Sequence, residues 1–283
     1  MILEKARAKI NLTLDVLGTR PDGYHEVLMV MQTLDFCDFV ALSPRDDGQI
    51  VVRSNASFVP LDERNLAYRA AAALRQQHAG ETRGVTIEID KRIPVAAGLA
   101  GGSSDAAATL RGLNVLWNIG LGAVDLAAIG ATVGSDVPFC VHGGTALVKG
   151  RGEIVEPLDL RPALWVVLAK PPLAVSTHDI YDAYDMNEER PHPSVHDMVE
   201  ALRGGDAVRI GEVSGNVLEN VTAALYPEVS RLKETMYRLG ASAVMMSGSG
   251  PTLFAVFNRE QRARRMYTAL RRGLKEVFLC QTY

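Results

Sequence analysis

The most restrictive feature of this sequence is the segment PVAAGLAGGSSDAAA, residues 94–108, where a glycine-rich stretch leads directly into an alanine-rich helix start. Glycine has no side chain, so the backbone can adopt positive φ values and an anion can approach its N–H groups closely. A helix start also offers unpaired N–H groups and the positive end of the helix dipole. The segment therefore predicts a phosphate-binding loop, with a tightly packed strand-to-helix connection as the alternative.

Individual residues of this segment have expected roles. We expect Ser103 or Ser104 to cap the helix, and the backbone freedom to come from Gly98, Gly101 and Gly102. Asp105 in the first helical turn suits the helix dipole but would repel a phosphate, and a nearby Mg²⁺ ion would remove that conflict. The magnesium ligands stay open, with Ser104 as one candidate. The residues expected to bind phosphate are Pro94, Val95, Ala96, Ala97, Gly98, Leu99, Ala100, Gly101, Gly102, Ser103 and Ser104.

Several familiar phosphate-binding signatures are missing from the chain. The pattern G-x-x-x-x-G-K-[ST] does not occur, and the loop is not the dinucleotide pattern G-x-G-x-x-G. The H-R-D and D-F-G signatures of protein kinases are also absent. The sequence therefore excludes a P-loop enzyme and a protein kinase.

Length and charge limit the remaining classes. A chain of 283 residues with 47% hydrophobic content can bury a large core, and its length suits two domains. We place the boundary before the apolar strand 163–170, which gives predicted domains 1–158 and 159–283. A net charge of -3 creates no overall field that would attract nucleic acid or an anionic membrane. An anionic substrate must therefore be bound by local geometry.

The cysteines and the N-terminus indicate the compartment. Cys37, Cys140 and Cys280 lie far apart in apolar sequence, which is typical of buried thiols in a reducing environment. The N-terminus lacks the layout of a secretory signal, and no apolar run is long enough to span a membrane. We therefore expect a cytoplasmic protein.

The first part of the chain predicts a hairpin. Residues 8–16 alternate apolar and polar, which indicates a strand with one buried face. Lys9 and Asn11 leave the same face, to meet either solvent or a common ligand. The turn chemistry of RPDGYH, residues 20–25, joins this strand to the extended segment 27–34.

The remaining elements mix without strict alternation, which predicts an α+β fold in both halves. Asn65 caps the first helix and Gly80 ends it. Further strands are expected at 85–89, 139–148, around 154, 163–170, 242–246, 252–257 and 276–282. Helices are expected at 66–79, 103–117, 124–133, 177–186, 194–203, 206–225, 228–239 and 259–272. The polar stretch 187–193 is expected to be a loop.

Three further positions carry candidate chemistry. Asp136 follows Gly134-Ser135 and precedes Val137-Pro138, a constrained corner that either presents a carboxylate or serves as a turn. Tyr24 and His25 offer rings that either bind a base or pack in the turn. The segment SGSGP, residues 247–251, is a hairpin turn or a set of N–H groups that faces oxygen anions.

Together, AKINL, DGYHE, GLAGGSSDAA and GSDVPF, with the later MSGSGP, resemble the GHMP kinases. Within that family they are most similar to the ATP-dependent kinases of the non-mevalonate isoprenoid pathway. Those kinases phosphorylate the 2-hydroxyl of a cytidine-diphosphate conjugate of methylerythritol. The resemblance implies an N-terminal domain like domain 2 of ribosomal protein S5 and a ferredoxin-like C-terminal domain. ATP and Mg²⁺ are the implied cofactors.

The resemblance also implies roles for single residues. Asp136 would take the proton of the substrate hydroxyl with Lys9 beside it, and Asn11 would contact the substrate. Tyr24 and His25 would hold the cytidine, with Tyr181 closing over the ring and Tyr184 as the alternative. Gly248 and Gly250 would lie on the diphosphate side.

Two rival hypotheses remain. A homoserine or mevalonate-type kinase would need no aromatic residues such as Tyr24 and His25 for its aliphatic substrate. A non-catalytic nucleotide-binding protein would need neither Lys9 nor Asp136. We expect a small-molecule substrate, no nucleic-acid or membrane partner, and a monomer or weak homodimer.

Overall fold

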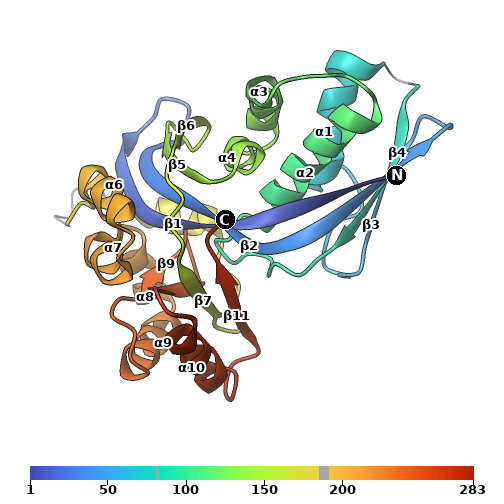
Figure 1. The fold of residues 1–283 in the computed structure, drawn as a ribbon. Helices are drawn as coiled ribbons and strands as arrows, with labels where there is room; N and C mark the ends of the chain where they lie inside the picture. The colour runs from blue at the N-terminus through green and yellow to red at the C-terminus, as the bar shows by residue number, and fades with distance from the viewer. Residues whose placement is uncertain (81, 185–190) are drawn as a thin grey trace.

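The structure is a computed structural model that describes residues 1–80, 82–184 and 191–283. It contains a seven-stranded and a four-stranded sheet with helices packed on both, which confirms the predicted α+β class. Figure 1 shows α1 to α4 at one end of the molecule and α9 and α10 at the other. Within the described residues, no helix is both long and apolar enough to cross a lipid bilayer.

The seven-stranded sheet follows the order β3-β4-β2-β1-β8, and β5 pairs with both β2 and β6. Its strands are β1 (Ile2–Thr19), β2 (His25–Arg45), β3 (Ile50–Ser54), β4 (Gly84–Asp90), β5 (Thr145–Lys149), β6 (Ile154–Leu158) and β8 (Gly215–Asn216). The predicted turn lies between β1 and β2, whose antiparallel pairing makes a hairpin much longer than expected. Three register shifts interrupt this pairing, which bends the hairpin.

The expectation that β1 has only one buried face was wrong. Every residue from Ala8 to Val16 is buried. The apolar side chains of Ile10 and Leu12 pack in a cluster with Val166 and Leu168 of the second sheet. The opposite face holds buried polar groups, among them Lys9. A buried lysine needs partners, so this face is a candidate site.

The helices beside the first sheet are α1 (Leu66–Leu74), the π-helix η1 (Arg75–Ala79), α2 (Gly101–Leu116), α3 (Ala123–Val133) and α4 (Val137–His142). The side chain of Asn65 accepts a hydrogen bond from the N–H of Ala67, so the predicted cap is confirmed. Six alanines of these two helices are fully buried in one cluster, and their small side chains let the helices pack closely: Ala67, Ala70 and Ala71 of α1 and Ala106, Ala107 and Ala108 of α2. The predicted strand 139–148 was partly wrong, because residues 137–142 form α4 and only β5 is extended.

The four-stranded sheet has the order β11-β7-β10-β9, with every neighbouring pair antiparallel. Its strands are β7 (Trp165–Lys170), β9 (Met245–Met246), β10 (Leu253–Phe257) and β11 (Glu276–Gln281). Numbered along the chain, this order is fourth, first, third, second, which agrees with the expected ferredoxin-like arrangement. The apolar run of β7 takes a central position with both faces covered.

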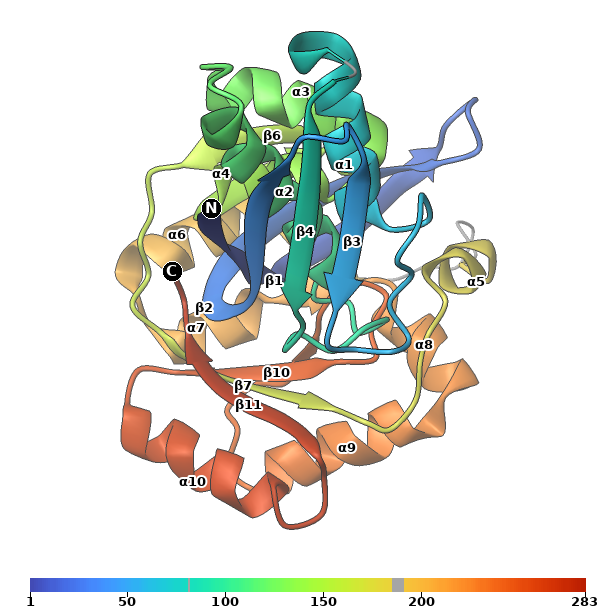
Figure 2. The ribbon, with the colours of Figure 1, turned by 90° about the vertical axis from the view of Figure 1, so that its right-hand side faces the viewer.

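The helices of the second half are α5 (Thr177–Asp182), α6 (Val195–Gly204), α7 (Ala207–Val213), α8 (Glu219–Leu225), α9 (Pro227–Arg238) and α10 (Glu260–Leu270). Figure 2 shows α9 and α10 against the outer face of the second sheet. The expected helix 206–225 was wrong, because β8 interrupts it and pairs with β1. α5 ends before the expected residue 186, and part of the expected loop 187–193 lies outside the described residues.

Candidate active site

A cavity of about 870 Å³ lies where the two halves of the chain meet. Its wall includes β1, the turn before β2, the loop 94–100, the start of α4, α5 and the loop between β9 and β10. These segments come from both sheets and from distant parts of the sequence. The predicted site residues are therefore brought together in space, with exceptions described below.

The glycine-rich loop adopts a different backbone from the one expected. Of its three glycines, only Gly98 has positive φ, at 73°. Ala96 and Ala100 take the other left-handed positions, with φ of 50° and 57°. Positive φ at every second residue turns successive N–H groups toward one side, which makes an anion-binding concavity. The loop can therefore present its N–H groups to an anion, but the assignment of positive φ to Gly101 and Gly102 was wrong.

Gly98 has a second structural requirement. A Cβ at this position would overlap the carbonyl oxygen of Ser247 in the loop between β9 and β10. The hydroxyl of Ser247 also donates to the carbonyl oxygen of Gly98 at 2.9 Å. The backbone N–H of Lys9 donates to the carbonyl oxygen of Leu99 at 3.2 Å. The loop is therefore fixed from β1 and from the second half of the chain.

The helix after the loop starts earlier than predicted. α2 begins at Gly101, and its N-cap is Ala100, which makes no side-chain cap bond, so the predicted serine cap was wrong. Ser103 lines the cavity in the first turn. Ser104 does not line it, because its hydroxyl donates to the carbonyl oxygen of Arg7 at 2.6 Å. Ser104 is therefore not placed to bind a phosphate or a metal ion through its side chain.

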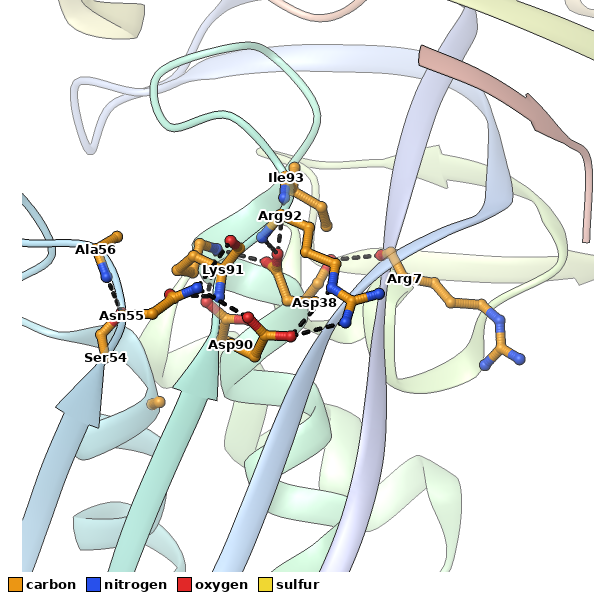
Figure 3. A network of polar contacts seen from close by, with 12 residues as sticks. Arg7, Asp38, Ser54, Asn55, Ala56, Asp90, Lys91, Arg92 and Ile93 are labelled. Atoms are coloured by element: carbon orange, nitrogen blue, oxygen red, sulfur yellow. Dashed lines mark hydrogen bonds and ion pairs between the residues drawn. The ribbon is translucent and has the colours of Figure 1, made fainter. Parts of the chain in front are cut away.

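A buried charge network supports both ends of the loop (Figure 3). Asp38 accepts hydrogen bonds from the backbone N–H groups of Arg92 at 2.5 Å and Ile93 at 2.7 Å. The ammonium of Lys91 lies 2.5 Å from Asp38 Oδ2 and 2.8 Å from Asp105 Oδ2. One cation therefore links the segment that enters the loop to the helix that leaves it.

The same network explains the carboxylate in the first turn of α2. Burial, and to a smaller degree the neighbouring Asp38 carboxylate, raises the pKa of Asp105 to about 8, although Lys91 acts in the opposite direction. A protonated Asp105 carries no charge that would repel a phosphate. Both the raised pKa of Asp105 and its contact with Lys91 reduce the repulsion that this side chain would exert on a phosphate.

Lys9 lies at the centre of the cavity wall and is 4% exposed. Its Nζ atom donates to Asn11 Oδ1 at 2.7 Å, so the two side chains share one face of β1 as predicted. The same Nζ lies 3.5 Å from Asp136 Oδ2. Lys9 is thus held between an amide and a carboxylate.

Asp136 presents its carboxylate because the start of α4 does not use it. Asp136 is the N-cap of α4, yet its side chain makes no cap hydrogen bond. An N-cap aspartate ordinarily accepts from an N–H of the first turn, but Pro138 removes one such donor. The Asp136 side chain is 30% exposed and lines the cavity beside Lys9.

The predicted aromatic residues gather at another part of the cavity. The rings of His25 and Tyr181 are 5.0 Å apart between centroids, with an interplanar angle of 38°. Burial, together with the charge of Asp136, raises the pKa of Tyr181. Tyr24 lines the cavity with half of its side chain exposed. Tyr184 lies in the apolar core instead, so the geometry favours Tyr181 of the two candidates.

The loop between β9 and β10 contributes one of its two predicted glycines. Gly248 lines the cavity, and a Cβ there would lie 3.4 Å from Lys9 Nζ. Gly250 does not line it, and a Cβ there would overlap the sulfur of Met246. Gly250 therefore serves local packing, and of the two glycines only Gly248 faces the cavity.

Sequence reasoning missed several residues of the wall. The apolar ones come from the connection between β3 and α1 and are Phe58, Val59, Pro60 and Leu66. The charged ones include Arg64, Lys91 and Arg151. Arg151 lies in the turn between β5 and β6, and only the fold brings this turn to the cavity. Within the described ranges, no cluster of three or more His, Cys, Asp or Glu side chains could hold a metal ion.

Comparison with known proteins agrees with this geometry. Residues 65–144 match the GHMP kinases N terminal domain and residues 198–276 match the GHMP kinases C terminal model. A 4-diphosphocytidyl-2-C-methyl-D-erythritol kinase of Brevibacillus brevis is 54% identical, over 97% of this chain and 94% of its own length. One of Shouchella clausii is also 54% identical, over 97% and 92%.

Solved structures give the same result. A crystal structure of 4-(cytidine 5'-diphospho)-2C-methyl-D-erythritol kinase has a TM-score of 0.83 and 35% identity, covering 99% of both chains. A homoserine kinase from Cytophaga hutchinsonii, at 19% identity and a TM-score of 0.76, covers 99% of this chain and 94% of its own and shares the fold alone. The chain therefore belongs to the GHMP kinases, a family of small-molecule kinases, and within it to the 4-diphosphocytidyl-2-C-methyl-D-erythritol kinases.

Proposed function

We propose that the protein transfers the γ-phosphate of ATP to the 2-hydroxyl of 4-diphosphocytidyl-2-C-methyl-D-erythritol, in the non-mevalonate route to isoprenoid precursors. The observation that carries this proposal is the pair Lys9 and Asp136 in one cavity with two recognisable regions. One region is the glycine-rich loop, and the other holds the rings of His25 and Tyr181. A phosphate donor and a base-containing acceptor would then meet at the pair.

In the proposed mechanism, Asp136 accepts the proton of the substrate hydroxyl as its oxygen attacks the γ-phosphorus. The bond from that phosphorus to the bridging oxygen breaks, and ADP leaves. Lys9 is fixed by Asn11 at 2.7 Å, so its ammonium can stabilise charge on the reacting oxygens without reorganising. Phosphoryl transfer needs little covalent work from the protein, so one base, one cation and the N–H groups of the loop suffice.

The cavity also suggests how ATP lies. The phosphates would lie on the loop 94–100 and on the first turn of α2, where unpaired N–H groups and the helix dipole favour anions. The adenine would lie against Phe58, Val59, Pro60 and Leu66, since these form an apolar part of the wall. The position of Leu66 supports this orientation of ATP. Its Cδ1 lies 3.5 Å from where a Cβ on Gly102 would be, so the apolar wall adjoins the first turn of α2.

Mg²⁺ fits the donors present. It is usually bound through substrate phosphates and one or two protein oxygens, and it would neutralise charge on the transferred phosphate. Ser103 is the cavity oxygen that we assign to it in place of Ser104. The hydroxyl of Ser103 is 4.0 Å from the position of a Cβ on Gly134, two residues before Asp136.

The acceptor would bind with its cytosine at Tyr24, His25 and Tyr181. The rings of His25 and Tyr181 already touch, so a base between them would require α5 to move away from β2. We also propose a cytoplasmic location, supported by three free cysteines, two of them buried. We further propose that the protein is a monomer or weak homodimer and has no nucleic-acid or membrane partner. We keep the proposed division into domains 1–158 and 159–283.

The test is a substrate comparison with purified protein and Mg-ATP. We expect phosphorylation of the cytidine-diphosphate conjugate of methylerythritol and no turnover of homoserine or mevalonate, because aliphatic acceptors leave the aromatic region empty. Product formation is followed by mass spectrometry, which also locates the new phosphate. Comparable efficiency with mevalonate, or phosphate on another hydroxyl, would contradict the proposed acceptor.

A further inference from the structure

Arg151 differs from the other cations of the cavity wall. Four lysines and arginines belong to the described part of this wall: Lys9, Arg64, Lys91 and Arg151. The first three pair with carboxylates. Lys9 lies 3.5 Å from Asp136, and Arg64 lies 2.7 Å from Asp62. Lys91 lies 2.5 Å from Asp38 and 2.8 Å from Asp105.

No carboxylate of the described residues forms an ion pair with the Arg151 guanidinium. Glu153 lies in the same turn, but its Oε2 accepts from the backbone N–H of Arg151 at 2.7 Å. The Arg151 charge is therefore available to an anionic ligand in the cavity.

The Arg151 side chain is held in place by two contacts. Its Nη2 atom donates to the carbonyl oxygen of Ala131 in α3 at 2.8 Å. Its Cζ atom lies 5.1 Å from the centroid of the Tyr24 ring, within the range of a cation–π contact. A guanidinium carries five N–H donors in a planar fork, so most remain free after the single bond to Ala131. The group is fixed but not saturated.

The backbone on either side places Arg151 between the two regions of the acceptor site. The carbonyl oxygen of Gly150 accepts from the N–H of Val27 at 2.7 Å, close to His25 along β2. On the other side, a Cβ on Gly152 would lie 3.3 Å from the Cβ of Ser135, the neighbour of Asp136. Arg151 therefore lies between the aromatic residues and the carboxylate that meets the hydroxyl.

We propose that Arg151 binds the diphosphate of the acceptor and so selects a cytidine diphosphate conjugate over a free alcohol or a monophosphate. This inference rests on the proposed function, in which cytosine binds at the rings and the hydroxyl at Asp136. The diphosphate joins these two parts of the substrate and must pass the turn between β5 and β6. An arginine fork matches two phosphate oxygens better than a lysine does.

The experiment compares Arg151→Met and Arg151→Lys with the parent protein. Methionine keeps an unbranched stem but removes the charge, whereas lysine keeps the charge but not the fork. Lys149→Met is the matched control, because Lys149 lies two residues before Arg151 and does not line the cavity. This substitution removes a positive charge that forms an exposed ion pair with Glu156. Calorimetry measures the affinities for cytidine, CMP and CDP, and steady-state kinetics gives KM for the conjugate and for ATP.

We expect Arg151→Met to weaken CDP binding and raise the KM of the conjugate by roughly tenfold to 100-fold, the usual worth of hydrogen bonds to a charged group. Cytidine affinity and the KM of ATP should stay within about twofold, because neither involves this diphosphate. Arg151→Lys should recover part of the CDP affinity. Lys149→Met should resemble the parent throughout.

Each contrary result has a defined meaning. If Arg151→Met binds CDP as tightly as the parent does, the inference is overturned. An equal loss of affinity for cytidine and CDP would also overturn it, because Arg151 would then act by holding the Tyr24 ring and not by binding the diphosphate. A change in the KM of ATP alone would also overturn the inference. If the parent itself fails to phosphorylate the conjugate, the proposed function fails, whatever Arg151 does to CDP binding. Circular dichroism establishes that each variant is folded.

Discussion

In the proposed mechanism, the chemistry depends most on Asp136. Asp136→Asn keeps the shape of the side chain but cannot accept a proton, so turnover should fall by roughly 10² to 10⁴, the usual worth of a positioned base. Affinities for ATP and for the acceptor should stay within about tenfold. The side chain caps no helix and is partly exposed, so the fold should persist. Steady-state kinetics with calorimetry provides the measurement, and near-parental turnover would remove Asp136 from the mechanism.

Asp105 should make stability depend on pH. Its pKa of about 8 in the fold lies above the ordinary value of 3.8, so between these values the folded state holds a proton that the unfolded chain has lost. Its contribution to the free energy of unfolding therefore falls as pH rises from about 4 to about 8. Asp105→Asn cannot titrate, so variant minus parent stability should rise with pH, by at most about 1.4 kcal/mol per unit.

The check is urea unfolding of parent and variant at pH 5, 6, 7 and 8. Taking the difference cancels the titration of the groups that both proteins share. Asp62→Asn is the control, because its partner Arg64 lowers the pKa of Asp62 to about 2 and both states are ionised in this window. A difference for Asp105→Asn as flat as the one for Asp62→Asn would show that Asp105 is charged in the fold.

Among the elements, the glycine-rich loop depends on its contact with the loop between β9 and β10. Gly98→Ala would force a Cβ into the carbonyl oxygen of Ser247, so it should lower both stability and ATP affinity. Gly120→Ala is the matched control, because Gly120 also has positive φ, 82°, but open space around it. It should show only the φ penalty of about 1–2 kcal/mol.

Chemical denaturation and ATP calorimetry distinguish these two variants. Equal destabilisation with unchanged ATP affinity in both would mean that the Ser247 contact does not hold the loop.

The elements also show which parts of the sequence could be read directly. Local signals predicted the cap at Asn65, the stop at Gly80 and the hairpin turn before β2, because each depends on neighbouring residues. The break of helix 206–225 at β8 could not be read, since it arises from pairing with β1 about 200 residues earlier along the chain. The left-handed φ of Ala96 and Ala100 had no local signal, because alanine rarely adopts positive φ.

At the scale of the whole molecule, motifs in the sequence predicted most of the proposed site residues. They did not predict the shape or the full wall of the cavity. Lys9, Asn11, His25 and Asp136 carry chemistry that their own segments display. Arg151 and the apolar wall near Phe58 belong to ordinary turns whose position depends on the complete fold. Sequence patterns thus predicted the groups to which we assign the chemistry, but only part of the cavity wall.

The two halves of the chain share their core, which has a consequence for unfolding. One cluster joins Leu14 and Met29 of the first sheet to Val167 of the second. Backbone bonds also cross the predicted boundary, from the N–H of Tyr283 to Thr33 at 2.9 Å and from that of Val217 to Leu14 at 3.1 Å. Neither half can unfold without exposing apolar surface of the other, so we expect a single cooperative transition.

The chain offers two probes for this prediction, because its two tryptophans lie in different halves: Trp117 follows α2 and Trp165 begins β7. Trp165→Phe leaves a reporter of the first half, and Trp117→Phe leaves a reporter of the second. In each variant, urea unfolding followed by fluorescence should coincide with that followed by far-ultraviolet circular dichroism. Comparison within one variant removes the effect of the substitution on stability. If fluorescence and circular dichroism give separate midpoints in either variant, residues 1–158 and 159–283 unfold as independent domains, and the shared core does not couple them.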